Sequence, residues 1–339
     1  MKLRENVPLA QYTTFKIGGP ARFFCTVSSE AGLIEAVSLA KREKQRILIL
    51  GGGSNILVSD CGFPGVVIKN EIMGKEIAPL KNAAEFRFSV GAGELWDGAV
   101  QTAVENGLYG LENLSAIPGT AGAAPVQNIG AYGTEAADSI MSVRVLDTES
   151  MQYSELSNES CRFGYRDSVF KQKKGRYIVT RVDFRLSKDG KVNIAYKDLR
   201  DYFAALAAPT LQEVRDAVID IRWKKLPDWK LWGTAGSFFK NPIISKDRFE
   251  KLKAVHPELP GYPEPDGRVK VPLGWIFDHI CNVKGIMAGN VGSYENQALV
   301  IVAKPGATAS QVVERAKELI AMVEKETGIK IEAEVEWVN

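Results

Sequence analysis

The segment between Ile117 and Gly133 restricts the fold of this chain more than any other part of its sequence. It is rich in glycine, alanine and proline, and it contains no charged residue. Glycine and proline disfavour a helix, and a solvated linker would carry more polar residues. We therefore expect the segment to pack beneath something flat, such as a ring system whose edge Gln127 and Asn128 could bind. A close-packed loop between domains is the alternative interpretation.

The length of the chain predicts more than one domain. Its 339 residues exceed the roughly 150 residues of one typical domain. The 45% hydrophobic and 25% charged residues are typical of a globular protein. Short strands alternate with helices, which predicts an α+β fold. We expect domains at residues 1–69, 70–218 and 219–329, with a final strand at residues 330–339 returning near the first domain.

Hydrophobic periodicity predicts individual elements within these domains. Ser29 is expected to cap a helix, because apolar residues follow it at helical spacing. Residues 47–50 are all apolar and predict a buried strand. Near the C-terminus, apolar residues at helical spacing precede Gly328, which predicts a helix that ends there. Residues 331–338 alternate as a strand would.

Charge and residue counts argue against several classes of protein. Lys and Arg number 43 against 41 Asp and Glu, a net charge of +2 without a basic run, so we expect no nucleic-acid binding. Four widely spaced cysteines and two histidines argue against a metal site or a disulfide scaffold. Residues 1–15 lack an apolar core segment, and no apolar run approaches the ~18 residues of a membrane span. We therefore expect a cytoplasmic enzyme with no secretion signal and no membrane insertion.

A glycine run, residues 51–55, follows the predicted strand at residues 47–50. Its sequence is Gly-Gly-Gly-Ser-Asn. Glycine lets backbone N–H groups approach an anion closely, and the serine and asparagine side chains add donors. The run matches neither the dinucleotide fingerprint nor the P-loop. It suits a phosphate cradle, although an ordinary glycine turn would look the same.

Three further motifs carry groups suited to catalysis or anion binding. Residues 161–168 place two arginines and a tyrosine around a glycine, which suits carboxylate or enolate recognition. Residues 233–242 present Ser237, whose surroundings do not match a nucleophilic serine motif but leave a role as proton donor open. On the predicted final strand, Glu332 and Glu334 would share a face, and one could act as a general acid. Surface salt bridges and solvated carboxylates are the structural alternatives.

In their order along the chain, these motifs resemble the UDP-N-acetylenolpyruvoylglucosamine reductase family, also called UDP-N-acetylmuramate dehydrogenase. The resemblance covers essentially the whole chain, through residues 14–19, 51–55, 110–119, 125–133, 161–168, 235–242 and 331–335. The sequence looks like the form of the enzyme with an extra tyrosine loop, because Tyr196 precedes Asp198-Leu199 between the second and third domains. It departs from the family pattern at Ala123, Tyr294 and Glu336.

The resemblance implies a PCMH-type FAD-binding fold of two α+β subdomains, followed by a third α+β domain that binds substrate. It also implies FAD as a non-covalent cofactor and NADPH as co-substrate. The FAD pyrophosphate would lie at the glycine run, and the flavin ring beside residues 117–133. The implied cofactor-binding residues are Gly51, Gly52, Gly53, Ser54, Asn55, Pro118, Gly119, Gly122, Gln127, Asn128, Gly130 and Arg222.

The reaction implied by the resemblance is reduction of the enolpyruvyl ether of UDP-N-acetylglucosamine-enolpyruvate to UDP-N-acetylmuramate, in peptidoglycan precursor synthesis. Hydride would pass from NADPH to FAD, and from flavin N5 to C3 of the ether. Ser237 would give a proton to C2, and Arg166 and Glu334 would stabilise the charge that develops at the carboxylate. The implied substrate-binding residues are Tyr165, Tyr196, Lys225, Asn241 and Gln297. We expect a monomer whose partner is this UDP-sugar.

Two other functions are compatible with part of the sequence. A flavin oxidase of the same fold, acting on an alcohol or lactone, would share the first two domains but would not need Lys225, Asn241 or Ser237. A non-catalytic nucleotide-binding protein would keep the glycine run without Ser237 and Glu334. The sequence contains all four of these residues, which favours the reductase.

Overall fold

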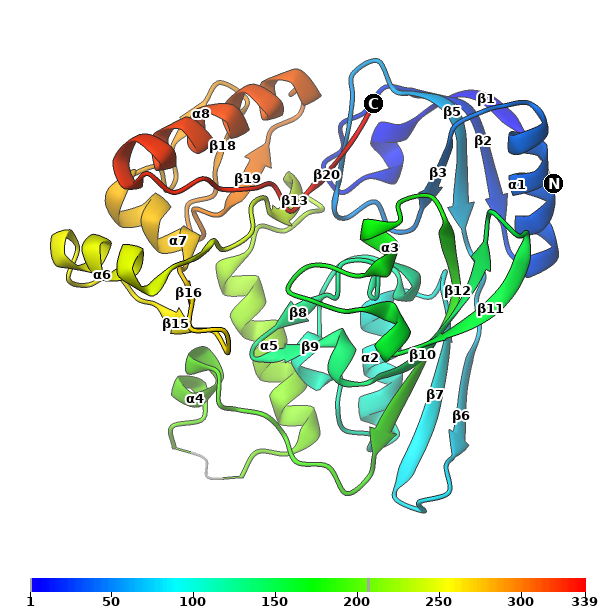
Figure 1. The fold of residues 1–339 in the computed structure, drawn as a ribbon, viewed down its shortest axis with the longest axis horizontal. Coiled ribbons are helices and arrows are strands. Elements are labelled where there is room, and N and C mark those ends of the chain that lie inside the picture. Colours follow the sequence, from blue (N-terminus) through cyan, green and yellow to red (C-terminus); the bar gives the residue numbers. More distant parts are fainter. Residues whose placement is uncertain (1, 206–207) are drawn as a thin grey trace. The chain divides into compact units, whose positions relative to one another are not determined.

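The computed structural model describes residues 2–205 and 208–339 of the chain (Figure 1). Contacts divide the chain into two compact units. The first consists of Met1–Val7, Ala21–Gly53 and Phe63–Trp223, and the second of Pro8–Pro20, Ser54–Gly62 and Lys224–Asn339. The three domain boundaries expected from the sequence stay a prediction. Within the described ranges, no helix is long and apolar enough to cross a membrane.

The first unit contains a four-stranded sheet with the strand order β1-β2-β5-β3. These strands and the helix beside them are Arg4–Pro8 (β1), Pro20–Val27 (β2), Ile47–Leu50 (β3), Phe63–Asn70 (β5) and Glu30–Arg42 (α1). Both β2 and β3 pair parallel with β5. The predicted start of α1 is confirmed, because the Ser29 side chain accepts a hydrogen bond from the N–H of Gly32. The predicted strand at residues 47–50 is also confirmed.

A second, five-stranded sheet of this unit has the order β11-β10-β12-β7-β6, and its pairs are antiparallel. Its strands are Lys75–Pro79 (β6), Glu85–Gly91 (β7), Ile140–Asp147 (β10), Gln152–Ser157 (β11) and Tyr177–Ser187 (β12). Helix α2 (Trp96–Glu105) shares a buried core with this sheet. In that core the ring of Trp96 meets the ring of Phe184 at 5.8 Å between centroids.

The other elements of the first unit are mostly short. They are Val169–Gln172 (α3), Lys197–Tyr202 (α4), Gly130–Ala131 (β8), Thr134–Glu135 (β9), and the 3₁₀ turns Glu112–Leu114, Ala121–Ala123, Ala136–Asp138 and Glu159–Cys161. The longer helix Leu211–Lys225 (α5) also belongs to this unit, except for its last two residues, which are assigned to the second unit. Helices α4 and α5 share a small apolar cluster that includes Leu199, Val214 and Val218, against which Tyr132 packs. Within segment 117–133, the regular elements are only the 3₁₀ turn Ala121–Ala123 and the two residues of β8. The segment forms neither a long helix nor an extended linker, as predicted.

The second unit contains two small antiparallel sheets and one parallel pair. The sheets have the orders β13-β19-β18-β17 and β14-β16-β15, and β20 pairs with β4. The strands are Ile56–Val58 (β4), Gly233–Ser237 (β13), Ile243–Ile244 (β14), Tyr262–Pro263 (β15), Val269–Lys270 (β16), Met287–Ala288 (β17), Val291–Ser293 (β18), Val300–Ala303 (β19) and Glu336–Val338 (β20). The helices are Leu9–Tyr12 (3₁₀), Lys246–Val255 (α6), Leu273–Trp275 (α7), Ile276–Ile280 (a π turn) and Ala309–Thr327 (α8).

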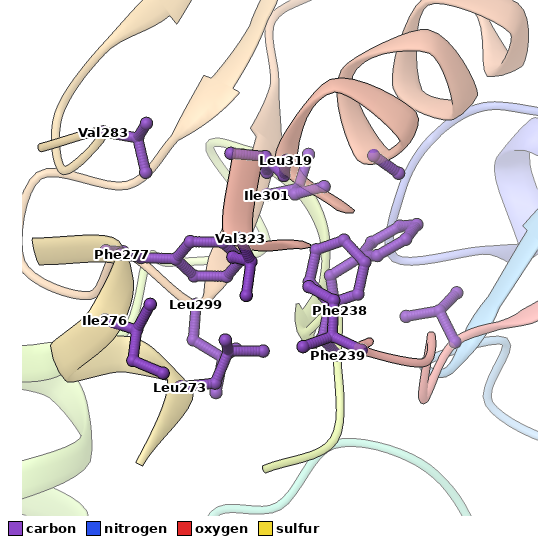
Figure 2. Packing of buried hydrophobic residues seen from close by; sticks show 14 of the residues in the cluster. Phe238, Phe239, Leu273, Ile276, Phe277, Val283, Leu299, Ile301, Leu319 and Val323 are labelled. Carbon is purple, nitrogen blue, oxygen red and sulfur yellow. The ribbon is translucent and has the colours of Figure 1, made fainter. Parts of the chain in front are cut away.

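Aromatic side chains form the centre of the second unit's core (Figure 2). The ring of Phe238 packs edge-on against Phe15 and against Phe239, with centroids 6.3 Å and 5.1 Å away. Phe239 in turn meets Phe277 at 5.8 Å. Leu319, from the apolar face of α8, belongs to the same cluster. This packing holds the residues that follow β13 in a fixed position.

The C-terminal segment is a strand only at its end. We expected one strand over residues 331–338, but β20 covers the last part alone. Before it, the N–H groups of Glu334 and Val335 both point to the carbonyl of Phe238, at 2.8 Å and 3.5 Å, so the alternating bonds of a regular strand are lost. The expected placement of Glu332 and Glu334 on one strand face is wrong for that reason. Glu332 is exposed and Glu334 is half-buried.

Helix α8 is stabilised at both ends. Gly328 ends it with a φ of 64°, which confirms the predicted stop. At the start, the carboxylate of Asp60 accepts hydrogen bonds from the N–H of Ala309 at 2.7 Å, and from the N–H and hydroxyl of Ser310 at 2.9 Å and 2.7 Å. These N–H groups have no acceptor within the helix. Partial burial alone would raise the pKa of Asp60, but the bonds from Ser310 and Ala309 outweigh it and lower the pKa.

We expect Asp60→Ala to lower the free energy of unfolding by about 1–2 kcal/mol at neutral pH, because the first turn of α8 loses its acceptor. The charge-dependent part of this contribution is present above the ordinary carboxyl pKa of 3.8 and is lost as the pH falls below it. Urea unfolding at several pH values measures it. Asp247→Ala is the control. That exposed carboxylate lies in the first turn of α6 and pairs with Lys251, and its loss should cost about 0.5 kcal/mol. Equal losses in the two variants would contradict the capping role of Asp60.

Candidate active site

The glycine run lies against the next predicted cofactor segment. A Cβ atom added at Gly51 would lie 2.5 Å from Oγ1 of Thr120, and one added at Gly52 would lie 2.7 Å from the Cα of Gly119. Real Cβ atoms do not come this close to other heavy atoms, so the approach of these two chain segments requires glycine. Gly53 has a φ of 62°, which also favours glycine. The structure thus brings residues 51–53 and 119–120 together within the first unit.

Three other predicted cofactor residues of this unit have different surroundings. Gly122 must be small for a packing reason, because a Cβ there would lie 2.5 Å from the Cβ of Ala92. Pro118 is exposed, and Gln127 is half-buried. These placements leave Pro118 and Gln127 accessible to a ligand, whereas the size of Gly122 is explained by the protein alone.

The side chain of Asn128 is engaged by the protein itself. Its Nδ2 donates to the carboxylate of Glu135 at 2.6 Å and to the carbonyl of Gly164 at 3.1 Å. Its Oδ1 accepts a hydrogen bond from the N–H of Ala137 at 2.9 Å. Asn128 is buried and has a φ of 45°. These bonds fix a left-handed backbone turn and orient the carbonyl of Asn128.

Arg166 is held by that turn. Its Nη2 donates to the carbonyl of Gly130 at 2.7 Å, and its Nη1 to the carbonyl of Asn128 at 3.3 Å. The guanidinium lies 5.7 Å from the ring centre of Tyr165. A Cβ at Gly130 would lie 3.0 Å from Nη1 of Arg166, so Gly130 leaves room for this side chain. The predicted residues 128, 130, 165 and 166 therefore form one cluster.

Arg222 lies near the same cluster, on α5. Its Nε donates to the carbonyl of Ala116 at 3.3 Å. Removal from water lowers the pKa of Arg222, the Tyr132 phenol and the Asp97 carboxylate act in the opposite direction, and the like charge of Arg166 lowers it further. Two cationic groups are thus close enough to influence each other. Such an arrangement suits an anionic ligand.

Tyr196 belongs to the first unit and meets Tyr132 there. The two rings pack edge to face, with centroids 5.5 Å apart. Tyr196 is 43% exposed, so part of its side chain is accessible to a ligand. Burial raises the pKa of Tyr132 to about 12. The amide of Asn113 donates to the carbonyls of Tyr132 and Asn193, each at 2.8 Å, and so links Tyr132 to the segment that precedes Tyr196.

In the second unit, the segment after Ser237 runs antiparallel to the segment that contains Glu334. The N–H of Glu334 donates to the carbonyl of Phe238 at 2.8 Å, and the N–H of Lys240 to the carbonyl of Glu332 at 3.0 Å. Phe239 forms a bridge with Ala333 between them. These bonds hold the predicted proton donor and the predicted glutamate in neighbouring segments, and the buried rings in Figure 2 anchor one side.

Asn55 also contacts the Glu334 segment. Its Nδ2 donates to the carbonyl of Glu334 at 3.2 Å, and its carbonyl accepts the N–H of Glu336 at 3.0 Å. Ser54 and Asn55 were predicted to bind the cofactor together with Gly51–Gly53. The division into units separates them, because Gly53 ends a segment of the first unit and Ser54 begins one of the second.

The predicted substrate residues Asn241 and Gln297 flank the start of α7. The Oδ1 of Asn241 accepts a hydrogen bond from the N–H of Leu273 at 2.9 Å. A Cβ at Gly274 would lie 2.8 Å from Oε1 of Gln297. Lys225 ends α5, and the preceding carbonyl, that of Lys224, accepts a bond from Asn296 at 3.2 Å. Asn296 precedes Gln297 in the chain, so the segments of the three predicted residues are linked within this unit.

Sequence reasoning missed four residues that hold the cluster of the first unit. They are Asp97, Asn113, Tyr132 and Arg215. Asp97 binds the N–H of Ala116, and Arg215 binds Asp97. Asn113 binds the carbonyl of Tyr132, whose side chain interacts with Arg222. Tyr132 lies within the motif at residues 125–133, but the sequence pattern does not predict its contact with Arg222. Asp97 and Arg215 stand far apart in the sequence, so only the packing of their helices makes them a pair.

We expect Gly52→Ala to weaken FAD binding by about 10- to 100-fold, because the added methyl group must displace the backbone of Gly119 and overpacking costs about 1–3 kcal/mol. Fluorescence titration of the apoprotein with FAD measures the affinity. The matched control is Gly98→Ala on α2, where the Cβ would meet only Leu95, at 3.9 Å. That variant should bind FAD normally and gain up to ~1 kcal/mol of stability. Unchanged FAD affinity in Gly52→Ala would contradict the cradle.

Two family models match separate parts of this chain. Residues 21–152 match the model of an FAD binding domain, and residues 227–338 match the UDP-N-acetylenolpyruvoylglucosamine reductase C-terminal domain. The UDP-N-acetylenolpyruvoylglucosamine reductase of Neisseria meningitidis is 42% identical, over 99% of this chain and 97% of its own. The protein of the same name from Pseudomonas aeruginosa is 40% identical, over 98% of both chains.

Solved structures agree with the sequence matches. The UDP-N-acetylenolpyruvylglucosamine reductase from Thermus caldophilus has a TM-score of 0.70 at 27% identity, covering 100% of both chains. A VAO-type flavoprotein from Myceliophthora thermophila has a TM-score of 0.51 at 12% identity, over 94% of this chain and 72% of its own. The second likeness concerns the fold alone. The two family models and the likeness to the Thermus caldophilus reductase confirm the expected FAD-binding α+β fold, and the near full-length matches show that this chain belongs to the UDP-N-acetylenolpyruvoylglucosamine reductase family.

Proposed function

We propose that this protein is an FAD-dependent reductase that uses NADPH to convert UDP-N-acetylglucosamine-enolpyruvate to UDP-N-acetylmuramate in peptidoglycan precursor synthesis. The observation that carries the proposal is the backbone pairing of residues 238–240 with residues 332–334. It keeps a hydroxyl, that of Ser237, and a carboxyl, that of Glu334, in adjoining segments of a chain from this family. No observation specifically favours an oxidase.

The glycine backbones fit a bound FAD. Gly51 and Gly52 lie where a Cβ would clash with Thr120 and Gly119, and glycine backbone of this kind lets N–H groups approach a pyrophosphate closely. Arg222 and residues 117–133, a segment without charged side chains, would flank the flavin ring. When bound, FAD supplies the hydride that the substrate receives. The protein would hold the cofactor without a covalent bond.

Ser237 would supply the proton that completes the reduction. Addition of hydride to one carbon of the enolpyruvyl double bond leaves negative charge on the neighbouring carbon, which must then be protonated. A serine hydroxyl is a weak acid, so it can act only from a fixed position close to a strongly basic carbon. The buried ring of Phe238 and the hydrogen bond that its carbonyl accepts from the N–H of Glu334 support such a position.

Arg166 and Glu334 would stabilise the charge that spreads to the substrate carboxylate. The guanidinium of Arg166 is held by the carbonyls of Asn128 and Gly130, so its orientation is set before substrate arrives. Preorganised donors of this kind lower a barrier because they do not have to reorient during the reaction. Glu334 would act on the same group.

The remaining predicted residues would bind the UDP-sugar. Lys225 and Asn241 would hold its diphosphate, with Gln297 as a further contact. Tyr196, whose ring is exposed beside Tyr132, would cover the nucleotide, and Tyr165 would bind near Arg166. We further propose a cytoplasmic monomer with two FAD-binding subdomains and a substrate-binding domain at the boundaries expected from the sequence.

The first test of this function is spectroscopic. We expect the purified protein to bind FAD, to release it on acid or heat treatment because the bond is not covalent, and to be bleached by NADPH under anaerobic conditions. UDP-N-acetylglucosamine-enolpyruvate should then restore the oxidised flavin spectrum, whereas simple alcohols or lactones should not reduce the flavin. A protein that stays colourless after incubation with FAD would refute the proposal.

We expect Ser237→Ala to slow reoxidation of the reduced flavin by substrate by about 10²- to 10⁴-fold, the usual contribution of a general acid. Reduction of the flavin by NADPH should stay within about twofold of wild type, because it does not use this proton. Stopped-flow absorbance separates the two half-reactions.

Ser245→Ala provides the control for this experiment. Ser245 caps α6 through a hydrogen bond from the N–H of Arg248 at 3.3 Å, so the substitution should lower stability and leave both half-reactions unchanged. A comparable loss in both half-reactions of Ser237→Ala would contradict its role as proton donor.

A further inference from the structure

Helix α5 carries two arginines toward the same region of the first unit. Arg215 and Arg222 lie about two turns apart, so they share one face of the helix. Arg215 is only 5% exposed. Its Nη1 and Nη2 donate to the two carboxylate oxygens of Asp97 at 2.7 Å and 3.0 Å. This fork joins α5 to the first turn of α2, where Asp97 lies.

The same carboxylate also binds the backbone just before segment 117–133. Oδ1 of Asp97 accepts a hydrogen bond from the N–H of Ala116 at 2.6 Å. Ala116 has a φ of 56°, a left-handed conformation that costs energy for a residue other than glycine. Such a conformation persists only where surrounding bonds enforce it. The bond from Asp97 is one of these.

Arg222 binds the other side of Ala116. Its Nε donates to the Ala116 carbonyl at 3.3 Å. Asp97 thus binds the N–H of Ala116, and Arg222 binds its carbonyl. Burial lowers the pKa of Arg222, and the Coulomb attraction of the Asp97 carboxylate acts in the opposite direction. Burial alone would raise the pKa of Asp97, but the bonds from Arg215 and Ala116 lower it overall. The carboxylate is therefore charged at neutral pH.

We propose that Asp97 and Arg215 are positioning residues for cofactor binding: together they fix the left-handed turn at Ala116 and, through it, the place of Arg222. The proposal rests on the proposed function, in which Arg222 and residues 117–133 flank the flavin. Neither Asp97 nor Arg215 needs to touch FAD. Loss of the carboxylate would release the turn and leave two arginines without their shared counter-charge.

The alternative is that this ion pair only stabilises the packing of two helices. Only one partner of the pair is buried, since the Asp97 side chain is 41% exposed, and an ion pair alone does not establish a functional role. The chain offers a matched pair for comparison in the same unit. Asp147 accepts bonds from Nη2 of Arg176 at 3.0 Å and from the N–H of Glu149 at 2.8 Å. It thus combines an arginine and a backbone amide as Asp97 does, but at the turn between β10 and β11.

The test compares Asp97→Asn with Asp147→Asn in the full-length protein. We expect both variants to lower the melting temperature of the apoprotein. Only Asp97→Asn should raise the dissociation constant for FAD, by about tenfold, equivalent to about 1.4 kcal/mol, and shift the visible spectrum of the bound flavin. Arg215→Lys, which keeps the charge and loses the fork, should weaken FAD binding in the same direction. It replaces Asp97→Asn if that variant does not fold.

A double-mutant cycle tests the route through Arg222. If Asp97 acts by positioning Arg222, its substitution should have little further effect on FAD affinity in an Arg222→Met background. Wild-type FAD affinity and spectrum in Asp97→Asn, with the same thermal loss as Asp147→Asn, would overturn the proposal, as would full additivity in the cycle. Failure of the wild-type protein to bind FAD would instead refute the proposed function.

Discussion

The main chain of residues 117–133 has to be held by side chains from elsewhere, and this constraint shapes the first unit. The segment has no charged side chain and little regular structure. Short turns satisfy only part of its backbone groups, such as the N–H of Ile129 on the carbonyl of Ala124, and the others need partners from outside the segment. Polar side chains bind its carbonyls, or the peptide just before it, at distances of 2.5–3.3 Å. These side chains are Asp97, Asn113, Arg166, Ser168 and Arg222.

Glycine and arginine together set the backbone positions in this unit. Gly52 and Gly119 allow two backbones to approach, because a Cβ at Gly52 would lie 2.7 Å from the Cα of Gly119. Arg166 has two roles in this arrangement. Arg166 orders the turn at Asn128 and Gly130 and is also the proposed partner of the substrate carboxylate.

Much of the fold could be predicted because it depends on local patterns. Ser29, Gly328 and the strand at residues 47–50 all lie where propensity and periodicity indicate. The prediction failed where a distant partner decides the conformation. The segment before β20 alternates like a strand, but its N–H groups turn to the carbonyl of Phe238, and no local pattern encodes that contact.

The sequence by itself determined the chemistry that is available: the glycines that permit close backbone approach, the hydroxyl at Ser237, and the family to which the order of the motifs belongs. Only the tertiary structure decided which groups hold that chemistry in place. Asp97, Ala116 and Arg215 are far apart in the chain and unremarkable by type. They form one hydrogen-bonded cluster because helix packing brings a carboxylate, a backbone amide and a guanidinium within hydrogen-bonding distance.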